Sequence, residues 1–204
     1  MNLVSRFFDQ ANRLGDRTFL GAKVDGEWVT RSWHETAAAV SSLTAFLSEQ
    51  GVAKGDRVLL LSENRPEWAI SDLAIMATGA YVVPAYTTHN VDDLRHILTL
   101  TNPSFAIVSS QALADRVLEA NVSHECVKQM IVMEPGSHDK PDWHTQIVSW
   151  PEEQADVQQP DTTDIQPDDT CALIFTSGTG GYPKAAMLTH RNIIHNVDAA
   201  AMVL

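Results

Sequence analysis

The chain has 204 residues, a formal net charge of -12 and a hydrophobic fraction of 44%. This acidic balance excludes a nucleic-acid-binding protein, because binding a phosphate backbone requires basic surfaces. No apolar stretch approaches the ~20 residues that a membrane-spanning helix needs. Length and composition therefore predict a cytoplasmic protein with one sizeable α/β domain, or one such domain and part of another.

The amino-terminal segment Met1–Ala11 has an amphipathic helical pattern in which Arg6 and Asp9 interrupt apolar residues. It lacks the continuous apolar core of a signal peptide, so we expect a helix that packs on the protein. Peripheral membrane contact is the alternative. The two cysteines, Cys126 and Cys171, lie in apolar segments and are predicted to be buried free thiols.

A small antiparallel hairpin is predicted next. Residues Thr18–Val24 and Glu27–Val29 flank Asp25-Gly26, a pair typical of a tight two-residue turn. Ser32 and Glu35 then have the spacing of a capping box, which predicts that a helix begins there.

The remaining amino-terminal part alternates short apolar runs with amphipathic segments. The expected strands are 57–62, 80–83, 105–109 and 130–133. The expected helices run from the capping box to Gly51, from Pro66 to about Gly79, and over 91–100 and 112–120. Repeated strand–helix units of this spacing predict an α/β fold: a mostly parallel sheet with helices on both faces, plus the antiparallel hairpin.

An acidic, proline-rich stretch follows. Between Asp139 and Asp169 there are nine acidic residues and one lysine, with four prolines. We expect an extended connector on the surface and not a metal site, since no calcium-loop pattern is present. The predicted organisation is an amino-terminal α/β subdomain over 1–138, a connector over 139–169, and the start of the next subdomain over 170–204.

The most informative segment is Thr176–Lys184, directly behind the apolar run Cys171–Phe175. A buried strand delivers such a loop to the edge of a sheet, where ligands bind. Its hydroxyls can donate to phosphate oxygens, and its glycines let backbone N–H groups approach an anion closely. The predicted phosphate-binding residues are Thr176, Ser177, Gly178, Thr179, Gly180, Gly181 and Lys184. The alternative is a surface loop without a ligand.

A Walker-type loop is excluded although Gly178 and Lys184 have its spacing. Pro183 stands at the position of its second glycine, and Ala185 at that of its magnesium-binding hydroxyl. A short apolar segment follows, and a helix begins only after Thr189, a plausible N-cap. We therefore expect the loop to join two strands.

The segment Phe175–His190 resembles the phosphate-loop signature of the adenylate-forming enzymes, which include acyl-CoA synthetases, adenylation domains of peptide synthetases, and luciferases. The family pattern is close to T-S-G-T-T-G-x-P-K-G, and this chain departs from it at Gly180 and Ala185. The resemblance runs from about Gly15 to the end. Its upstream parts are Gly51–Val58, Ser62–Trp68 and Gly79–Tyr86. The sequence around Pro84–Thr88 looks more like long-chain fatty acyl-CoA synthetases than like peptide-synthetase domains.

This resemblance implies an ATP-dependent acid–thiol ligase with ATP, Mg²⁺ and CoA as cofactor and cosubstrates. Members of the family are much longer chains, so the sequence is interpreted as an amino-terminal fragment. The resemblance places the adenine and ribose contacts, an acidic magnesium ligand and a catalytic lysine beyond Leu204. We therefore assign no catalytic residue or metal ligand here, and expect the fragment alone to be inactive.

Two alternatives remain open. Within the family, the protein could serve a carrier protein or be luciferase-like. Outside it, the chain could be a non-catalytic nucleotide-binding or interaction module. The eight histidines contain no H-E-x-x-H pattern, which argues against zinc. Trp68, Tyr81 and Tyr86 could border an acyl or CoA pocket, although core packing is the commoner role of such aromatics.

Overall fold

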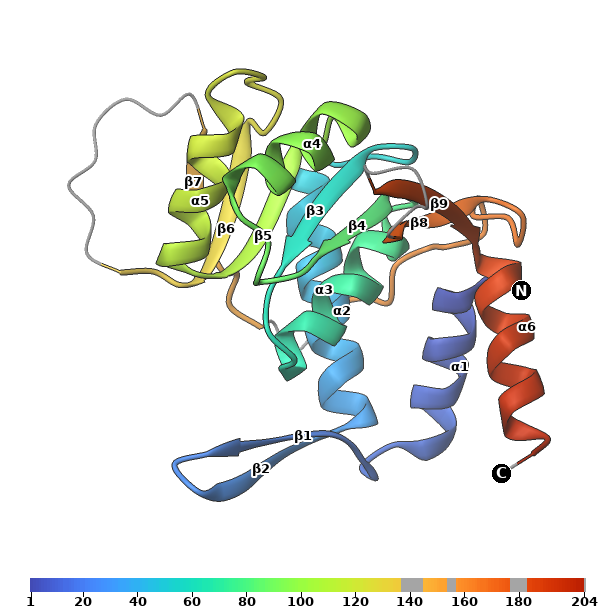
Figure 1. Ribbon diagram of the computed structural model, residues 1–204. Helices are drawn as coiled ribbons and strands as arrows, with labels where there is room; N and C mark the ends of the chain where they lie inside the picture. The colour runs from blue at the N-terminus through green and yellow to red at the C-terminus, as the bar shows by residue number, and fades with distance from the viewer. Residues whose placement is uncertain (137–144, 154–156, 177–182, 204) are drawn as a thin grey trace.

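A seven-stranded sheet forms the centre of the protein, in the order β7-β6-β5-β3-β4-β8-β9. The computed structural model describes residues 1–136, 145–153, 157–176 and 183–203 (Figure 1). The strands of the sheet are β3 (Arg57–Leu61), β4 (Tyr81–Ala85), β5 (Phe105–Ser110), β6 (Gln129–Glu134), β7 (Gln146–Ser149), β8 (Thr170–Thr176) and β9 (Lys184–Thr189). Neighbouring strands are parallel except for the antiparallel pair β8–β9, which confirms the predicted fold class.

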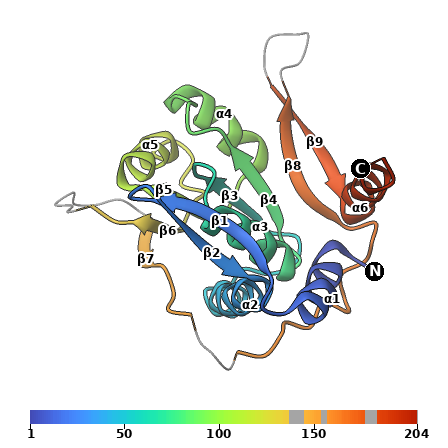
Figure 2. The ribbon, with the colours of Figure 1, turned by 90° about the horizontal axis from the view of Figure 1, so that it is seen from below.

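Helices cover both faces of this sheet, as the sequence predicts. The helices are α1 (Leu3–Leu14), α2 (Trp33–Glu49), α3 (Pro66–Ala77), α4 (Val91–Thr101), α5 (Gln111–Asn121) and α6 (His190–Ala201). Successive residues of β3 point to opposite faces. Val58 and Leu60 join the core beneath α1, α2 and α3, whereas Leu59 and Leu61 join the core beneath α4 and α5. Figure 2 shows α4 and α5 on one side of the sheet and α2 on the other.

The predicted hairpin and capping box are both present. Strands β1 (Thr18–Val24) and β2 (Glu27–Ser32) pair antiparallel around a turn in which Asp25 and Gly26 have positive φ angles of 50° and 88°. The Ser32 backbone N–H donates to Glu35 Oε2 at 2.7 Å, and the Glu35 N–H donates to Ser32 Oγ at 3.1 Å. Helix α2 therefore begins where the sequence pattern places it.

The amino-terminal helix α1 packs on the protein. Its apolar face, formed by Val4, Phe7, Phe8 and Ala11, is buried. No helix in the described part of the chain is long and apolar enough to span a bilayer. The cysteines are also as expected, since Cys126 and Cys171 are both buried and free.

Part of the acidic connector is a strand, which the sequence analysis does not anticipate. Residues Gln146–Ser149 form β7, which pairs in parallel with β6 from Gln129↔Gln146 onward. The apolar pair within β7 is too short to give a strand pattern of its own. Farther along, the Lys54 ammonium donates to the Asp164 carbonyl and contacts the Asp169 carboxylate, each at 2.6 Å. The connector is thus fastened to the body of the protein.

Strands β8 and β9 separate from the rest of the sheet at its carboxyl edge. Strand β8 pairs with β4 only at Val82↔Ala172. The next residues of β4 include Pro84, which carries no N–H for a further ladder hydrogen bond. The sequence analysis ends this strand at Val83, but β4 continues to Ala85 through its pairing with β3. Beyond Val82, no further ladder pairing joins β4 to β8, and the two strands diverge (Figure 2).

Candidate functional site

The predicted phosphate loop connects β8 to β9, as expected of a loop between two strands. Thr176 is the last residue of β8 and lies opposite Lys184, the first residue of β9. Both are exposed. Ser177, Gly178, Thr179, Gly180 and Gly181 lie outside the described residues. The structure thus places Thr176 and Lys184, the two ends of the predicted cradle, opposite each other in the ladder. Their hydroxyl and ammonium groups fit a polyphosphate, which accepts hydrogen bonds from both.

Two clefts open beside this hairpin, at the carboxyl ends of the parallel strands. The first, which we call the α4–β8 cleft, has a volume of about 530 Å³ and lies between Asp92–Ile97 and Ile174–Thr176. The second, the β3–β4 cleft, has a volume of about 580 Å³ and lies between the ends of β3, β4 and β8. Both exist because β8 leaves β4 after a single bridge. Ligands of parallel sheets bind at this edge.

Helix α4 fixes one end of the predicted loop. The His96 Nε2 atom lies 3.0 Å from the Pro183 carbonyl oxygen, a hydrogen-bonding distance. The His96 ring also meets the Phe175 ring edge-on, with centroids 6.4 Å apart. His96 therefore joins α4 to β8 and to the residue that precedes β9, and it forms part of the wall of the α4–β8 cleft. His96 could not be identified from the sequence, because nothing near it in the chain relates it to Pro183.

The loop between β4 and α4 contributes to both clefts and to a third. His89 lines all three, and Tyr86 lines the first two. The rings of Tyr86 and His89 meet edge-on with centroids 5.4 Å apart. His89 Nδ1 is buried, and no partner for it is present among the described residues. His89 is thus a residue of three clefts with an orphaned buried nitrogen, and no sequence motif indicates it.

The aromatic residues singled out from the sequence have different roles. Tyr86 is 70% exposed and borders the clefts. Trp68 borders the β3–β4 cleft and also packs against the core beneath α2 and α3. Tyr81 packs against the core beneath α4 and α5, with no place in either of these clefts.

A carboxylate lies at the far side of the β3–β4 cleft. Ser62, Glu63 and Asn64 follow directly on β3 and line this cleft. The Ser109 hydroxyl at the end of β5 donates to the Glu63 carboxylate, and this hydrogen bond lowers the pKa of Glu63. Glu63 is therefore ionised at neutral pH. Negative charge at this position disfavours an anionic group there and favours the phosphate-loop end of the site for anions.

The described residues show no magnesium site. No group of three or more histidine, cysteine, aspartate or glutamate side chains within them is placed to hold a metal ion. A divalent ion that accompanies a nucleotide is commonly held by few protein ligands together with phosphate oxygens. We therefore assign no residue of this chain to it.

Comparison with known proteins identifies relatives of the whole chain. The family described as AMP-binding enzyme matches residues 7–203. A long-chain-fatty-acid–CoA ligase of Mycobacterium tuberculosis is 29% identical over 203 residues, which is 98% of this chain and 33% of the relative. The chain thus spans about a third of the length of the curated relatives it matches.

Solved structures share the fold. A putative long-chain-fatty-acid CoA ligase of Rhodopseudomonas palustris has a TM-score of 0.81 at 22% identity, covering 100% of this chain and 48% of that one. The luciferase-like enzyme of the mealworm Zophobas morio has a TM-score of 0.80 at 23% identity, covering 98% and 45%. At these identities the likeness concerns the fold alone.

Proposed function

Because this chain belongs to the AMP-binding enzyme family, we propose that the protein is an ATP-dependent acid–thiol ligase. It activates a fatty acid as an acyl adenylate and passes the acyl group to CoA. A carboxylate oxygen attacks the α-phosphorus of ATP, and the bond to the bridging oxygen breaks to release pyrophosphate. The thiolate of CoA then attacks the acyl carbonyl carbon and expels AMP.

The observation that supports this proposal is the position of the two residues that flank the predicted phosphate loop. The strands β8 and β9 bring Thr176 and Lys184 together beside the α4–β8 cleft. A polyphosphate on the loop would then lie next to a substrate in the cleft, as an adenylation requires. In this proposal the β- and γ-phosphates are held by Thr176, Ser177, Gly178, Thr179, Gly180, Gly181 and Lys184.

The work of this site is positioning and charge neutralisation. Phosphoryl and adenylyl transfer leave little covalent chemistry to the protein, so donors aimed at the departing oxygens account for most of the rate. Backbone N–H groups and hydroxyls of the loop would hold the leaving pyrophosphate in line, and Lys184 would offset its developing charge. A bound Mg²⁺ supplies further charge neutralisation on the phosphates.

The choice of a fatty acid and CoA rests on the similarity to the mycobacterial long-chain-fatty-acid–CoA ligase, at 29% identity. The apolar wall formed by Ile97, Ile174 and Phe175 is compatible with an acyl chain. An adenylating enzyme that delivers its acyl group to a carrier protein would use the same loop and cleft. Only the acceptor distinguishes the two.

The decisive experiment is an ATP–pyrophosphate exchange assay on the complete gene product with a series of fatty acids. Exchange that depends on the acid is expected, and addition of CoA should then yield acyl-CoA detectable by mass spectrometry. Exchange without thioester formation, but with acylation of a carrier protein, would favour the carrier-protein alternative. Absence of exchange with every acid would overturn the assignment as an adenylating ligase.

A further inference from the structure

The loop from Tyr86 to Asn90 is fastened in three ways. Its backbone turns back on itself through the His89 N–H, which donates to the Tyr86 carbonyl at 2.9 Å. Asn90 caps helix α4, accepting from the Asp93 N–H at 2.9 Å while its own N–H donates to the Asp93 carboxylate at 3.0 Å. The turn and the helix cap both join residues that are close in sequence. The third is Arg116.

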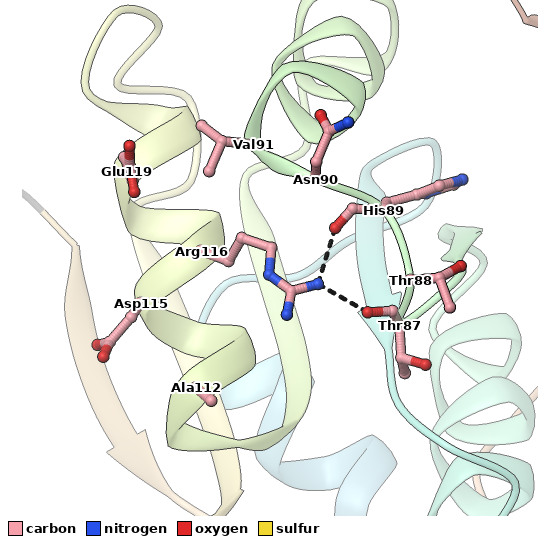
Figure 3. A pocket seen from close by; sticks show the side chains of 9 residues that line it. All are labelled: Thr87, Thr88, His89, Asn90, Val91, Ala112, Asp115, Arg116 and Glu119. Carbon is pink, nitrogen blue, oxygen red and sulfur yellow. Dashed lines mark hydrogen bonds between the residues drawn. The ribbon is translucent and has the colours of Figure 1, made fainter.

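Arg116 ties this loop to helix α5. Its Nη1 donates to the carbonyl oxygens of Thr87 and His89, at 2.7 Å each. Figure 3 shows the guanidinium reaching from α5 across to the loop, in the cleft of about 800 Å³ that separates them, while the His89 side chain points away from it. Hydrogen bonds from a charged donor are stronger than those between neutral groups. Arg116 is thus the tether that relates this loop to another element.

The tether acts on the residues that shape the clefts. Its two acceptor carbonyls lie on either side of Thr88, so Arg116 restrains the backbone from Thr87 to His89. The turn and the helix cap restrain the same loop through contacts that are local in sequence. The fixed backbone directs the His89 ring to the place where the α4–β8 and β3–β4 clefts meet. Its buried Nδ1 has no partner among the described residues.

We propose that Arg116 is a positioning residue: through the carbonyls of Thr87 and His89 it holds the Tyr86 and His89 rings in the cleft wall, and thereby sets the binding of the organic substrate beside the phosphate loop. The proposal rests on the proposed function. The substrate is one with an apolar part for Ile174 and Phe175 and a hydrogen-bonding group for His89. The acid and the thiol acceptor both have this chemistry, and the assay separates them.

The test compares three substitutions in the complete protein. Arg116→Met removes every donor and keeps an unbranched stem, whereas Arg116→Lys retains a cation that can donate to the same carbonyls. Arg191→Met is the matched control, because Arg191 is exposed and pairs with Asp168 at the opposite end of β8. Should Arg116→Met fail to fold, Arg116→Gln replaces it, since its shorter amide cannot reach both carbonyls with a charged donor.

The kinetic result expected is a rise of about tenfold in the KM for the acid or for CoA in Arg116→Met, the effect of losing about one net hydrogen bond. The KM for ATP should change less than about twofold, and Arg116→Lys should recover most of the loss. An equal rise in all three KM values, or no rise for either organic substrate, would overturn the proposal. The control should match the unsubstituted protein.

A second readout does not depend on activity. In histidine-labelled protein, the imidazole resonances of His89, assigned with His89→Gln, should shift in Arg116→Met and return in Arg116→Lys. An unchanged His89 signal in Arg116→Met means that Arg116 does not position this ring. If the unsubstituted protein lacks acid-dependent exchange, the proposed function fails, and this spectrum still decides whether Arg116 holds the loop.

Discussion

At the scale of single residues, Thr176 and Lys184 are the two described ends of the predicted phosphate loop. Thr176 and Lys184 face each other across the first pair of the β8–β9 ladder, so neither can move without the hairpin. Lys184 is the only fixed positive charge in the predicted cradle. Its side chain is exposed, and its contribution therefore depends on the ligand and not on packing in the free protein.

Substitution of Lys184 should affect one half-reaction. A charge-assisted hydrogen bond to the leaving pyrophosphate contributes roughly 1–3 kcal/mol, or about ten- to hundredfold in the rate of adenylation. We expect Lys184→Ala to slow acid-dependent pyrophosphate exchange by that factor, while transfer from a supplied acyl adenylate to CoA stays nearly intact. Similar losses in both half-reactions would indicate a folding defect, which thermal unfolding of the variant would reveal.

Asp72 on α3 should make stability dependent on pH. Burial raises the pKa of Asp72 to about 7, far above its value in an unfolded chain. Burial, and then the nearby Asp72 carboxylate, also raise the pKa of the Cys171 thiol to about 12. The folded state holds the Asp72 proton more tightly than the unfolded state. Its stabilising contribution is therefore complete below pH 4 and is lost as the pH rises toward 7.

The expected result is a stability difference that grows with pH. Asp72→Asn removes the ionisation and retains the shape, so the variant should gain roughly 1–3 kcal/mol relative to the unsubstituted protein between pH 5 and pH 8. Urea unfolding at both pH values measures this difference. Comparing the two proteins at each pH cancels the contributions of the other carboxylates. A difference that is independent of pH would contradict a raised pKa at Asp72.

At the scale of elements, local signals locate most strands and helices, and packing decides where they end. The capping box of Ser32 and Glu35 and the turn at Asp25-Gly26 depend only on neighbouring residues, so they were predictable. Strand β7 was not predictable, because it is stabilised by its pairing with β6 and its own sequence has no strand pattern. Strand β4 likewise continues through Pro84, since β8 has already separated there.

Two glycines that end helices allow a controlled test of packing. Gly51 and Gly79 follow α2 and α3 with positive φ angles of 88° and 78°. A Cβ at Gly51 would meet nothing within 4 Å, whereas a Cβ at Gly79 would lie 3.0 Å from Lys54 Cβ and Cγ. Gly51→Ala should cost about 1 kcal/mol from backbone strain alone. Gly79→Ala should cost roughly 1–2 kcal/mol more.

Chemical unfolding of the two variants measures that difference directly. Equal losses would show that Lys54 moves aside without cost, and that the contact between the Gly55 and Gly79 loops is not tightly packed.

At the scale of the whole molecule, the candidate site is formed by separation of strands and not by any single motif. The sequence predicts the loop and its two flanking strands because hydroxyls, glycines and a lysine follow an apolar run. It does not predict the clefts, His89 or Arg116. These depend on where β8 leaves β4 and on which carbonyls α5 can reach, which are both consequences of tertiary packing.

The hairpin that carries the loop joins the body through β8, which contributes buried residues to both cores. Beyond the bridge at Val82↔Ala172, helix α6 rests on α1, where Arg6 pairs with Asp198. Helix α6 buries only His190 completely. The two cores beneath the helices are formed mainly by the strands β3 to β6 and their own helices, with Cys171, Ala172 and Leu173 of β8. We therefore expect the body of the protein to fold without support from elsewhere.

The chain can thus contain everything that folding needs and still lack part of the active site. The chain spans 33% of the length of its mycobacterial relative. We predict that the 204-residue polypeptide alone forms neither acyl adenylate nor acyl-CoA above background. It should nevertheless unfold cooperatively on heating, because both cores are contained within it. Acid-dependent pyrophosphate release from this polypeptide would contradict the prediction, whereas an inactive but unfolded chain would refute the argument that its cores suffice.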